Sequence, residues 1–434
     1  MNAYFKEENI NSSNESNYFS TRLIALYFIA ISGSLGTAIS ALGRITLLGT
    51  SLIVLLLSFY KPFKTQKNST KYFTVFTLLA IAYLALSISW SSVEMQSAVL
   101  SWARQARILS IPLVYLLIRN SNEARNILRI FILGQLFVVI SACMLAFGLA
   151  VPWATAHTSK VHYVVFGSYL EQSITHAILV SILWFTKNWI FGKNGKHIAV
   201  ASALITVVLT LGFLKGRSGH LALIGMIAFI ALCELPKKIK WMAVFVPLIL
   251  LVLALTFSGN FRERVQLIQS DLSTYSLNTP PGAETSSGLR LKFWRASVKA
   301  FIEKPILGYG VGSWKLAYAE IEKLDKPENS LTDVDPHQMF LLWAVEGGLV
   351  GLLLQCAVLA ALLYQSKELD QRNAYALQAV VLGLMISGMF NSMLIGIGIG
   401  DYFCILIGIL VSIDKQKIPS QIKLPIRTNK NNII

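Results

Sequence analysis

Three residues of this apolar chain are of types that can act on a phosphorylated group. Arg217 follows a glycine in a short turn between two apolar runs, Arg290 begins an amphipathic segment, and His337 ends a long polar segment. A guanidinium presents a planar fork of N–H groups that matches phosphate oxygens, and it does not lose its charge. A histidine can take up a proton near neutral pH without a metal. These residue types predict a phosphate-binding pair of arginines and a general base.

Each of the three residues also has a simpler explanation, which the sequence leaves open. An arginine at a helix end, such as Arg217, often only anchors the helix at the membrane surface. Arg290 could be a surface charge, although phosphate groups favour the start of a helix. His337 could be an interfacial histidine without a task, although Asp333 and Asp335 lie close enough in the chain to orient its ring.

The polar segment that holds Arg290 is unevenly charged. Residues 290–315 contain six Lys or Arg and one acid, whereas residues 320–335 contain six Asp or Glu and two Lys. A basic stretch beside a membrane could hold phosphate groups, or it could be a solvated helix face. The residues expected to bind substrate are Arg217, Arg290, Lys215, Arg295 and Trp294.

The elements that must position these residues are membrane-spanning helices. The chain of 434 residues is 54% hydrophobic and only 14% charged, which is too apolar for a soluble domain of this length. A helix needs about 20 apolar residues to cross a bilayer. The sequence predicts an all-α polytopic membrane protein with about twelve spans, at residues 22–40, 45–60, 73–89, 99–118, 128–150, 172–190, 198–214, 218–233, 241–257, 338–364, 374–393 and 397–413.

The loops between the spans predict their orientation. Lys and Arg gather in alternate loops and in the C-terminal tail, so the positive-inside rule places both termini in the cytoplasm. The start of the chain lacks the features of a signal peptide, so the first span is expected to be an uncleaved anchor. The predicted units are a disordered tail (1–21), nine spans (22–257), a large outer loop with amphipathic helices (258–337), three spans (338–413) and a basic tail (414–434).

Two local patterns describe the outer loop. Residues 289–304 predict an amphipathic helix, because Leu291, Trp294, Val298 and Phe301 recur three and four positions apart. The glycines of residues 308–312 are spaced as in a nucleotide-binding loop, but no strand precedes them. They predict a sharp turn that brings the loop back to the membrane.

Several other kinds of site are not expected. The four cysteines lie in apolar runs without a C-x-x-C pair, so neither a disulfide framework nor a zinc site is predicted. A lone Asp-x-Asp at residues 333–335 is common by chance, and the predicted loop at 41–44 is short and has no acid. The net charge of +16 lies mostly in short loops between spans, which membrane orientation explains without nucleic acid. No metal or cofactor is expected, and membrane lipids are expected partners.

Taken in order, these motifs resemble the O-antigen ligase family, which also includes O-antigen polymerases and some protein O-oligosaccharyltransferases. The resemblance is sharpest over residues 200–352, and one departure is Gln338, where asparagine commonly follows the histidine. The motifs that carry it are Gly216-Arg217-Ser218-Gly219, Arg290 to Trp294, residues 305–314, His337-Gln338, and Glu346-Gly347-Gly348-Leu349-Val350-Gly351.

The resemblance implies a fold, a reaction and site residues. Family members are bundles of about twelve helices in the bacterial inner membrane, with a large periplasmic loop and no metal requirement. They move a glycan from undecaprenyl diphosphate to an acceptor in the periplasm, and for ligases this acceptor is the outer core sugar of lipid A–core. By motif, the functional residues of the family correspond to Arg217, Arg290 and His337. The arginines would stabilise the leaving diphosphate, and the histidine would activate the acceptor hydroxyl.

Other functions share part of this pattern. A polymerase or a protein O-oligosaccharyltransferase would use the same donor with another acceptor, and the closing motif favours the ligase. A polyprenyl-glycan transporter would instead need ionisable residues buried inside spans or an internal repeat. Neither a repeat nor an ion pair inside the spans is apparent in the sequence.

Overall fold

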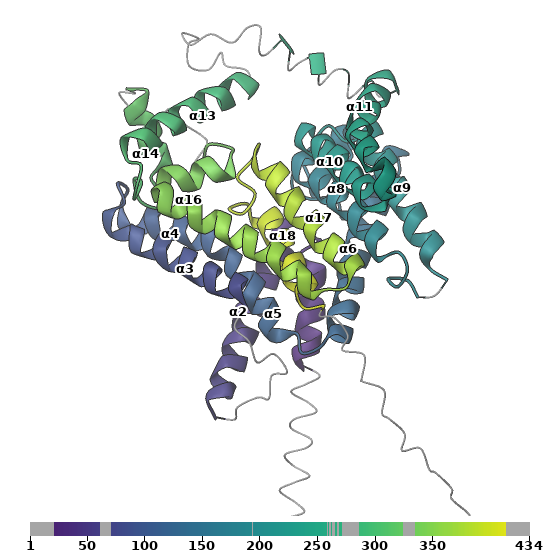
Figure 1. The fold of residues 1–434 in the computed structure, drawn as a ribbon, viewed down its shortest axis with the longest axis horizontal. Helices are drawn as coiled ribbons and strands as arrows, with labels where there is room; N and C mark the ends of the chain where they lie inside the picture. The colour runs from purple at the N-terminus through teal and green to yellow at the C-terminus, as the bar shows by residue number, and fades with distance from the viewer. Residues whose placement is uncertain are drawn as a thin grey trace, which may run out of the picture.

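The computed structural model describes residues 21–60, 71–192, 194–257, 286–323 and 335–413, with a few isolated positions between 259 and 270. These residues form helices joined by turns, and no β-strand occurs among them (Figure 1). Helices satisfy their own backbone hydrogen bonds, as segments that cross a bilayer must. The all-helical prediction is therefore confirmed. The two predicted tails and the junctions of the outer loop at 271–285 and 324–334 lie outside the described residues.

The helices follow one another along the whole described chain. After a first helix at Thr21–Ser32, the chain forms α2 (Thr37–Tyr60), α3 (Tyr72–Leu86), α4 (Met95–Gln105), α5 (Ser110–Leu117), α6 (Ser121–Ala146), α7 (Ser159–His162), α8 (Tyr169–Thr186), α9 (Lys196–Gly212), α10 (Arg217–Glu234), α11 (Phe245–Phe257), α13 (Ser286–Glu303), α14 (Trp314–Ile321), α16 (Met339–Gln365), α17 (Gln371–Gly388) and α18 (Ile397–Leu410). Short 3-10 turns lie at Ser87–Trp90, Ala106–Leu109, Lys237–Val244 and Ser366–Glu368.

Five helical stretches of the described chain are long and apolar enough to cross a membrane. They are Thr37–Leu57, Tyr72–Trp90, Ser121–Ala146, Arg217–Glu234 and Met339–Glu368. Shorter apolar helices lie at Thr21–Ser32, Lys196–Gly212 and Ile397–Leu410. Helical residues occur in every one of the predicted span ranges, but the number of spans and their orientation remain predictions. The predicted span at 99–118, for example, is divided into α4, a 3-10 turn and α5.

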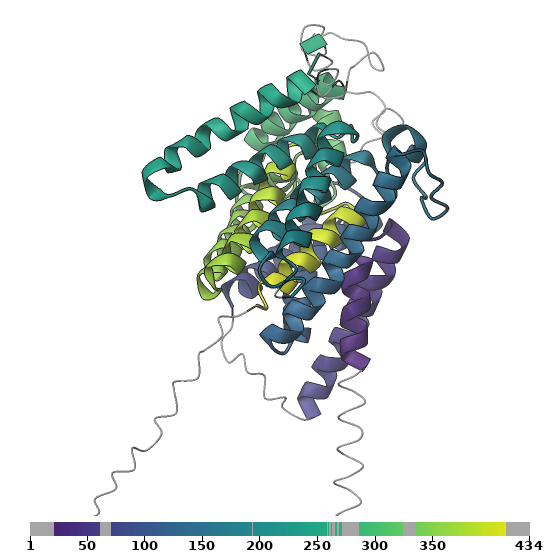
Figure 2. The same ribbon diagram turned by 90° about the vertical axis from the view of Figure 1, so that its right-hand side faces the viewer.

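The helices pack in three groups, which are defined by their contacts. Helices α8, α9, α10 and α17 pack together, α16 lies along α3, and α18 packs against α2, α5 and α6. Helices α13 and α14 lie over the N-terminal half of α16 (Figure 1). Seen from the side, the purple N-terminal helices and the teal helices that end in α11 lie at opposite edges of the bundle (Figure 2).

The turn between the first two spans lies earlier than predicted. The sequence placed it at residues 41–44, whereas α2 begins at Thr37 and includes Arg44. Gly43 allows α2 to lie against the first helix, since a Cβ there would come 1.7 Å from the Ser32 Oγ. As a result Arg44 faces Asp401 of α18, with 3.3 Å between Nη1 and Oδ1, and Ser40 Oγ donates to Asp401 Oδ2 at 3.0 Å.

This contact corrects the expectation that no ion pair lies inside the spans. The Asp401 side chain is 1% exposed and Arg44 is 23% exposed. A buried carboxylate is costly unless it is paired and hydrogen-bonded. Sequence spacing did not reveal the pair because its partners are far apart in the chain.

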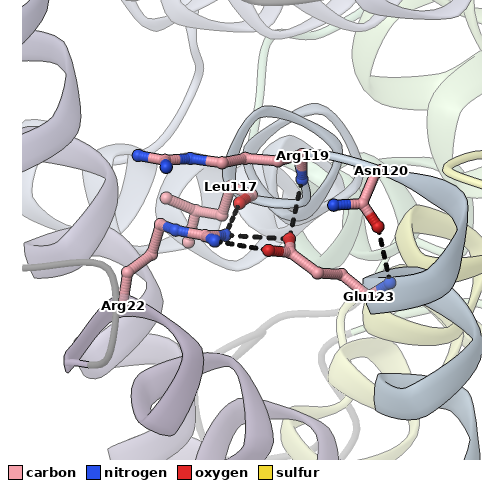
Figure 3. Close-up of polar contacts among 5 residues, drawn as sticks. All are labelled: Arg22, Leu117, Arg119, Asn120 and Glu123. Atoms are coloured by element: carbon pink, nitrogen blue, oxygen red, sulfur yellow. Dashed lines mark hydrogen bonds and ion pairs between the residues drawn. The ribbon is translucent and has the colours of Figure 1, made fainter. Parts of the chain in front are cut away.

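A second buried ion pair ties the first helix to the turn between α5 and α6 (Figure 3). Arg22 Nη2 lies 2.7 Å from Glu123 Oε1, and Arg22 Nη1 also donates to the Leu117 carbonyl. The Arg119 backbone N–H donates to Glu123 Oε2 at 2.9 Å, and Asn120 caps α6 by accepting from the Glu123 N–H. One carboxylate thus joins two helix ends and satisfies their polar groups.

Helix α16 is kinked at Gly348, which has φ 61° and ψ −157°. In a regular helix the N–H groups of Leu349 and Val350 would bond to the carbonyls of Val345 and Glu346. Here they donate instead to the carbonyls of Pro305 and Ile306, at 2.7 and 3.4 Å. The kink therefore leaves backbone groups open to another segment.

That segment is the glycine loop, residues 305–313. Its Tyr309 and Gly310 N–H groups donate to the freed Val345 and Glu346 carbonyls, both at 2.9 Å. Gly308 allows the close approach, since a Cβ there would lie 2.5 Å from the Val345 oxygen. The predicted sharp turn is confirmed for these residues, with Gly308, Gly310 and Gly312 at positive φ, while the return to the membrane remains a prediction. The loop replaces one turn of helical hydrogen bonds.

The predicted amphipathic helix exists as α13, but its buried face differs from the predicted one. Val298 is 47% exposed, whereas Phe293 and Ala296 are buried, together with Ser297 and Ala300. Small side chains let α13 approach α14, where the Trp314 Nε1 donates to Ser297 Oγ at 2.8 Å. The predicted stripe omitted Phe293 and the small residues beside it, which form the buried face of α13.

We expect Gly348→Ala to destabilise the protein by about 1–3 kcal/mol, because an alanine would be held at positive φ and its Cβ would meet the Ile306 carbonyl. Thermal unfolding in detergent measures the change. Gly212→Ala is the matched control, since nothing lies within 4 Å of a Cβ built there. Equal stability of the two variants would contradict the role of the kink.

Candidate functional site

Arg217 is the first residue of α10, after Gly216 in the turn from α9. The glycines of this turn lie against α8, where a Cβ on Gly216 or Gly219 would come within 2.1 Å of the Ser173 Oγ. This packing fixes the start of α10. From there the Arg217 Nη1 donates to Ser287 Oγ in the first turn of α13, at 2.9 Å. Arg217 is thus directed at the helix that carries Arg290.

Arg290 lies in the second turn of α13 and does not open the helix as the sequence predicted. Helix α13 begins at Ser286, so Arg290 is its fifth residue and its N–H is not among the unpaired groups of the helix start. Ser287, Arg290 and Trp294 are spaced by three and four residues and share one face. Arg290 therefore lies between the residue that contacts Arg217 and the tryptophan one turn further on.

His337 lies immediately before α16 in a left-handed conformation, with φ 51°. Its backbone N–H donates to Asp335 Oδ1 at 2.7 Å, and its Nδ1 lies 3.8 Å from the same oxygen. Its ring stacks on Phe293 of α13, with centroids 6.3 Å apart. The side chain is 30% exposed, so the ring is positioned but accessible.

Trp294 ties α13 to the segment that holds His337. Its Nε1 donates to the Pro336 carbonyl at 3.1 Å, and its ring lies 6.1 Å from that of Phe390. The sequence assigned Trp294 to substrate binding. The structure shows that its indole N–H is used to hold the residue before the histidine.

The turn between α17 and α18 joins the remaining parts of the site. Asn391 Nδ2 donates to Ser218 Oγ at the start of α10, at 3.0 Å, and Ser392 Oγ donates to Asp335 Oδ1 at 2.6 Å. The residue after Arg217 and the carboxylate beside His337 thus contact adjacent residues of one turn. The sequence placed both residues inside a predicted span at 374–393, whereas α17 ends at Gly388. A polar Asn-Ser pair between two apolar helices was the signal available.

These contacts bring Arg217, Arg290 and His337 to one region around α13. Arg217 contacts α13 at Ser287 and His337 contacts it at Phe293, which are six residues or roughly 9 Å apart along the helix axis. Arg290 lies between them in the helix. The three elements come from positions far apart in the chain, and their catalytic roles remain predictions.

The other predicted site residues differ in whether the structure places them in this region. Lys215 is half-buried in the turn before α10. Arg295 is exposed, and helical geometry places it about 140° around α13 from Arg290, so the two do not share a face. Asp333 lies outside the described residues, while Asp335 contacts the histidine.

A cavity of about 490 Å³ lies beside the site, between α4, the glycine loop and α16. Leu342 and Glu346 of α16 line it, five and nine residues after His337, and Ile395 lines it three residues after Ser392. Glu346 is 3% exposed and accepts a hydrogen bond from Gln105 Nε2 at 2.6 Å. Glu346 therefore both pairs with Gln105 and lines the cavity.

The glycine loop also anchors the end of α13. The Tyr309 hydroxyl donates to Glu303 Oε2 at 2.9 Å, and Lys304 Nζ lies 3.9 Å from the centre of the tyrosine ring. Burial, and then the hydrogen bond to the carboxylate, raise the pKa of Tyr309 above its ordinary value. The phenol therefore stays a donor at physiological pH, which keeps this end of α13 in place.

Within the described residues, no three His, Cys, Asp or Glu side chains gather as they would around a metal ion. The four cysteines are free thiols. Metal-independent chemistry remains an expectation from the sequence.

Comparisons with known proteins find one matching family and two similar proteins. Residues 198–356 match the family described as O-antigen ligase, and this range contains Arg217, Arg290 and His337. A Rickettsia conorii protein with the provisional name polysaccharide ligase is 32% identical over 130 residues, which cover 29% of this chain and 31% of that protein. An uncharacterized protein of Haemophilus influenzae is 24% identical over 283 residues, covering 64% of this chain and 69% of that protein.

We expect Trp294→Phe to loosen the segment before α16, because phenylalanine keeps an aromatic ring beside Phe390 but lacks the donor to the Pro336 carbonyl. Hydrogen exchange should become faster at the amides of 335–338, with thermal unfolding changed by no more than about 1.5 kcal/mol. Lys299→Gln, an exposed change on the same helix, is the control. Unchanged exchange in Trp294→Phe would show that the indole does not hold this segment.

Proposed function

We propose that this chain, whose residues 198–356 match the O-antigen ligase family, transfers a glycan from undecaprenyl diphosphate to the outer core sugar of lipid A–core. The observation that carries the proposal is the gathering of Arg217 and His337 at α13, the helix of Arg290. The reaction needs an anion-stabilising group on one side of the sugar and a base on the other. Arg217 contacts α13 at Ser287, and His337 contacts it six residues further on, at Phe293.

We assign the leaving group to the two arginines. As the bond between the sugar C1 and the diphosphate oxygen breaks, negative charge grows on the diphosphate. Arg217 and Arg290 would stabilise that charge more strongly in the transition state than in the ground state. The undecaprenyl diphosphate leaves with the electron pair of the broken bond, so no nucleotide is needed.

We assign the acceptor to His337. Asp335 faces the Nδ1 of the ring, so Nε2 is the nitrogen assigned as base. It would take the proton of the acceptor hydroxyl as its oxygen attacks C1 from the side opposite the leaving group, which inverts that carbon. Ser392 and Trp294 would hold the segment of Asp335 and Pro336 so that the ring keeps one orientation.

The proposed location follows from the donor. The active site would face the periplasm from the bacterial inner membrane, with the polyprenyl tail in the lipid and the glycan above it. Exposed apolar side chains on α2 and α11 suit contact with lipid. A polymerase or a protein O-oligosaccharyltransferase would use the same donor and the same three residues.

A transporter is the alternative from a different class, and one observation speaks for it. The ion pair between Arg44 and Asp401 is of the kind that transporters bury inside their helices. However, Asp401 also accepts from Ser40 and is closed off by its own neighbours. This satisfied arrangement favours a structural role, so glycan transfer remains the proposed function.

We expect His337→Ala to lower the transfer rate by about 10²–10⁴. The assay uses purified protein, undecaprenyl-diphosphate glycan and lipid A–core, with EDTA and without nucleotide. Gln338→Asn keeps an amide that can cap α16 and serves as the control. Near-normal transfer by His337→Ala would refute the base assignment, and elongation of the glycan on its carrier would identify a polymerase.

We expect Arg217→Lys to lower kcat by about 10²–10³, because an ammonium keeps the charge but loses the planar fork that matches the diphosphate. The same assay with both substrates saturating measures it. Arg295→Lys, on the exposed side of α13, is the matched control and should change kcat little. If the two variants behaved alike, Arg217 would be only a membrane anchor.

A further inference from the structure

The cavity between α4, the glycine loop and α16 has no role in the chemistry proposed so far. Its walls mix hydroxyl, amide and charged groups with apolar side chains. The lining residues that the argument uses are Ser97, Ser101, Arg104, Gln105, Leu342 and Glu346. At about 490 Å³ the cavity is within the range of small-molecule binding sites.

On one wall of the cavity, the Glu346 carboxylate has its hydrogen bonds from the protein itself. The neighbouring Gln105 keeps one buried acceptor atom without a hydrogen bond. The Glu346 carboxylate accepts from Gln105 Nε2 at 2.6 Å, and the backbone amides of Gly312 and Trp314 also face it. Gln105 is 3% exposed, and its Oε1 has no hydrogen-bond partner among the described residues. A buried acceptor without a partner is costly. Because Gln105 lines the cavity, a small rotation of its side chain that brings Oε1 to a donor on a bound molecule would remove this cost.

The facing side of α4 offers more hydrogen-bonding groups. Ser97 and Ser101 are four residues apart and lie on one face, with Arg104 on the next turn. Arg104 is exposed. Lys315 of α14 lines the cavity from the opposite side, and Leu100, Leu316 and Leu342 give it apolar surface. Hydroxyl and amide groups beside apolar surface suit a saccharide, which has many hydroxyls on rings with apolar faces.

The position of the cavity indicates which of the two saccharides of the proposed reaction, donor or acceptor, it would bind. Leu342 lies in the first turn of α16, just after the segment of His337, and Ile395 lies three residues after Ser392, which donates to Asp335. The segments that line this side of the cavity are therefore the ones that hold the proposed base. Arg217 reaches α13 from α10, a helix that contributes nothing to the cavity lining. The sugar beside a general base is the acceptor, because the base must reach its hydroxyl.

We propose that this cavity binds the acceptor saccharide and presents its hydroxyl to His337, an inference that rests on the function proposed above. Gln105 Oε1 accepts from one sugar hydroxyl, and Ser97 and Ser101 contact others. Arg104 and Lys315 suit a phosphate or carboxylate substituent on the same glycan. Glu346 holds Gln105 in place from behind.

The test compares Ser97→Leu with Gln96→Leu. Both residues are exposed neighbours on α4, but only Ser97 lines the cavity. Ser97→Leu is expected to raise the KM for lipid A–core about tenfold or more, with kcat and the KM for the donor nearly unchanged. Gln96→Leu is expected to match the wild type. Equal KM values in both variants, or a change in the donor KM alone, would overturn the proposal.

A binding measurement separates this proposal from the proposed function. Core oligosaccharide released from lipopolysaccharide is titrated by calorimetry into the wild type, Ser97→Leu and Gln96→Leu in detergent. Thermal unfolding first checks that the three proteins are equally stable. Weaker binding to Ser97→Leu alone would support the site even if no donor were turned over. Binding that is absent in the wild type, or equal in all three proteins, would overturn the site even if transfer occurred.

Discussion

The exchange of backbone hydrogen bonds at the kink of α16 is the constraint on which the outer part of this protein depends. Two N–H groups and two carbonyls that a straight helix would pair internally are paired with the glycine loop instead. An unpaired backbone group in an apolar bundle costs several kcal/mol, so the kink and the loop require each other. The loop follows α13 directly, and His337 lies two residues before the start of α16. Both therefore take their positions from this one junction.

Around that junction, polar side chains rather than large apolar contacts align the proposed site. Asn391 and Ser392 contact Ser218 and Asp335, and Trp294 contacts Pro336. Each bond is modest by itself, but together they hold three helix ends in register. The apolar helices below supply stability, and this polar layer supplies orientation.

Sequence reasoning succeeded where the signal is local. Apolar runs and turn residues identified the helices, and the residue types of Arg217, Arg290 and His337 selected a region that the fold does bring together. It failed where the cause is distant in the chain. The partner of Arg44 is Asp401, and the buried face of α13 is decided by Trp314 of another helix. Neither follows from the spacing of residues within one segment.

The contact made by Asn391 and Ser392 has a consequence for the order of synthesis. Arg217 is translated at about the midpoint of the chain, but Ser218 and Asp335 meet their partners only after the ribosome has passed residue 392. The helices up to α11 are synthesised well before then. A nascent chain therefore holds the two ends of its site apart until the turn between α17 and α18 emerges, and a chain that stops after α17 has every proposed catalytic residue without the turn that joins them.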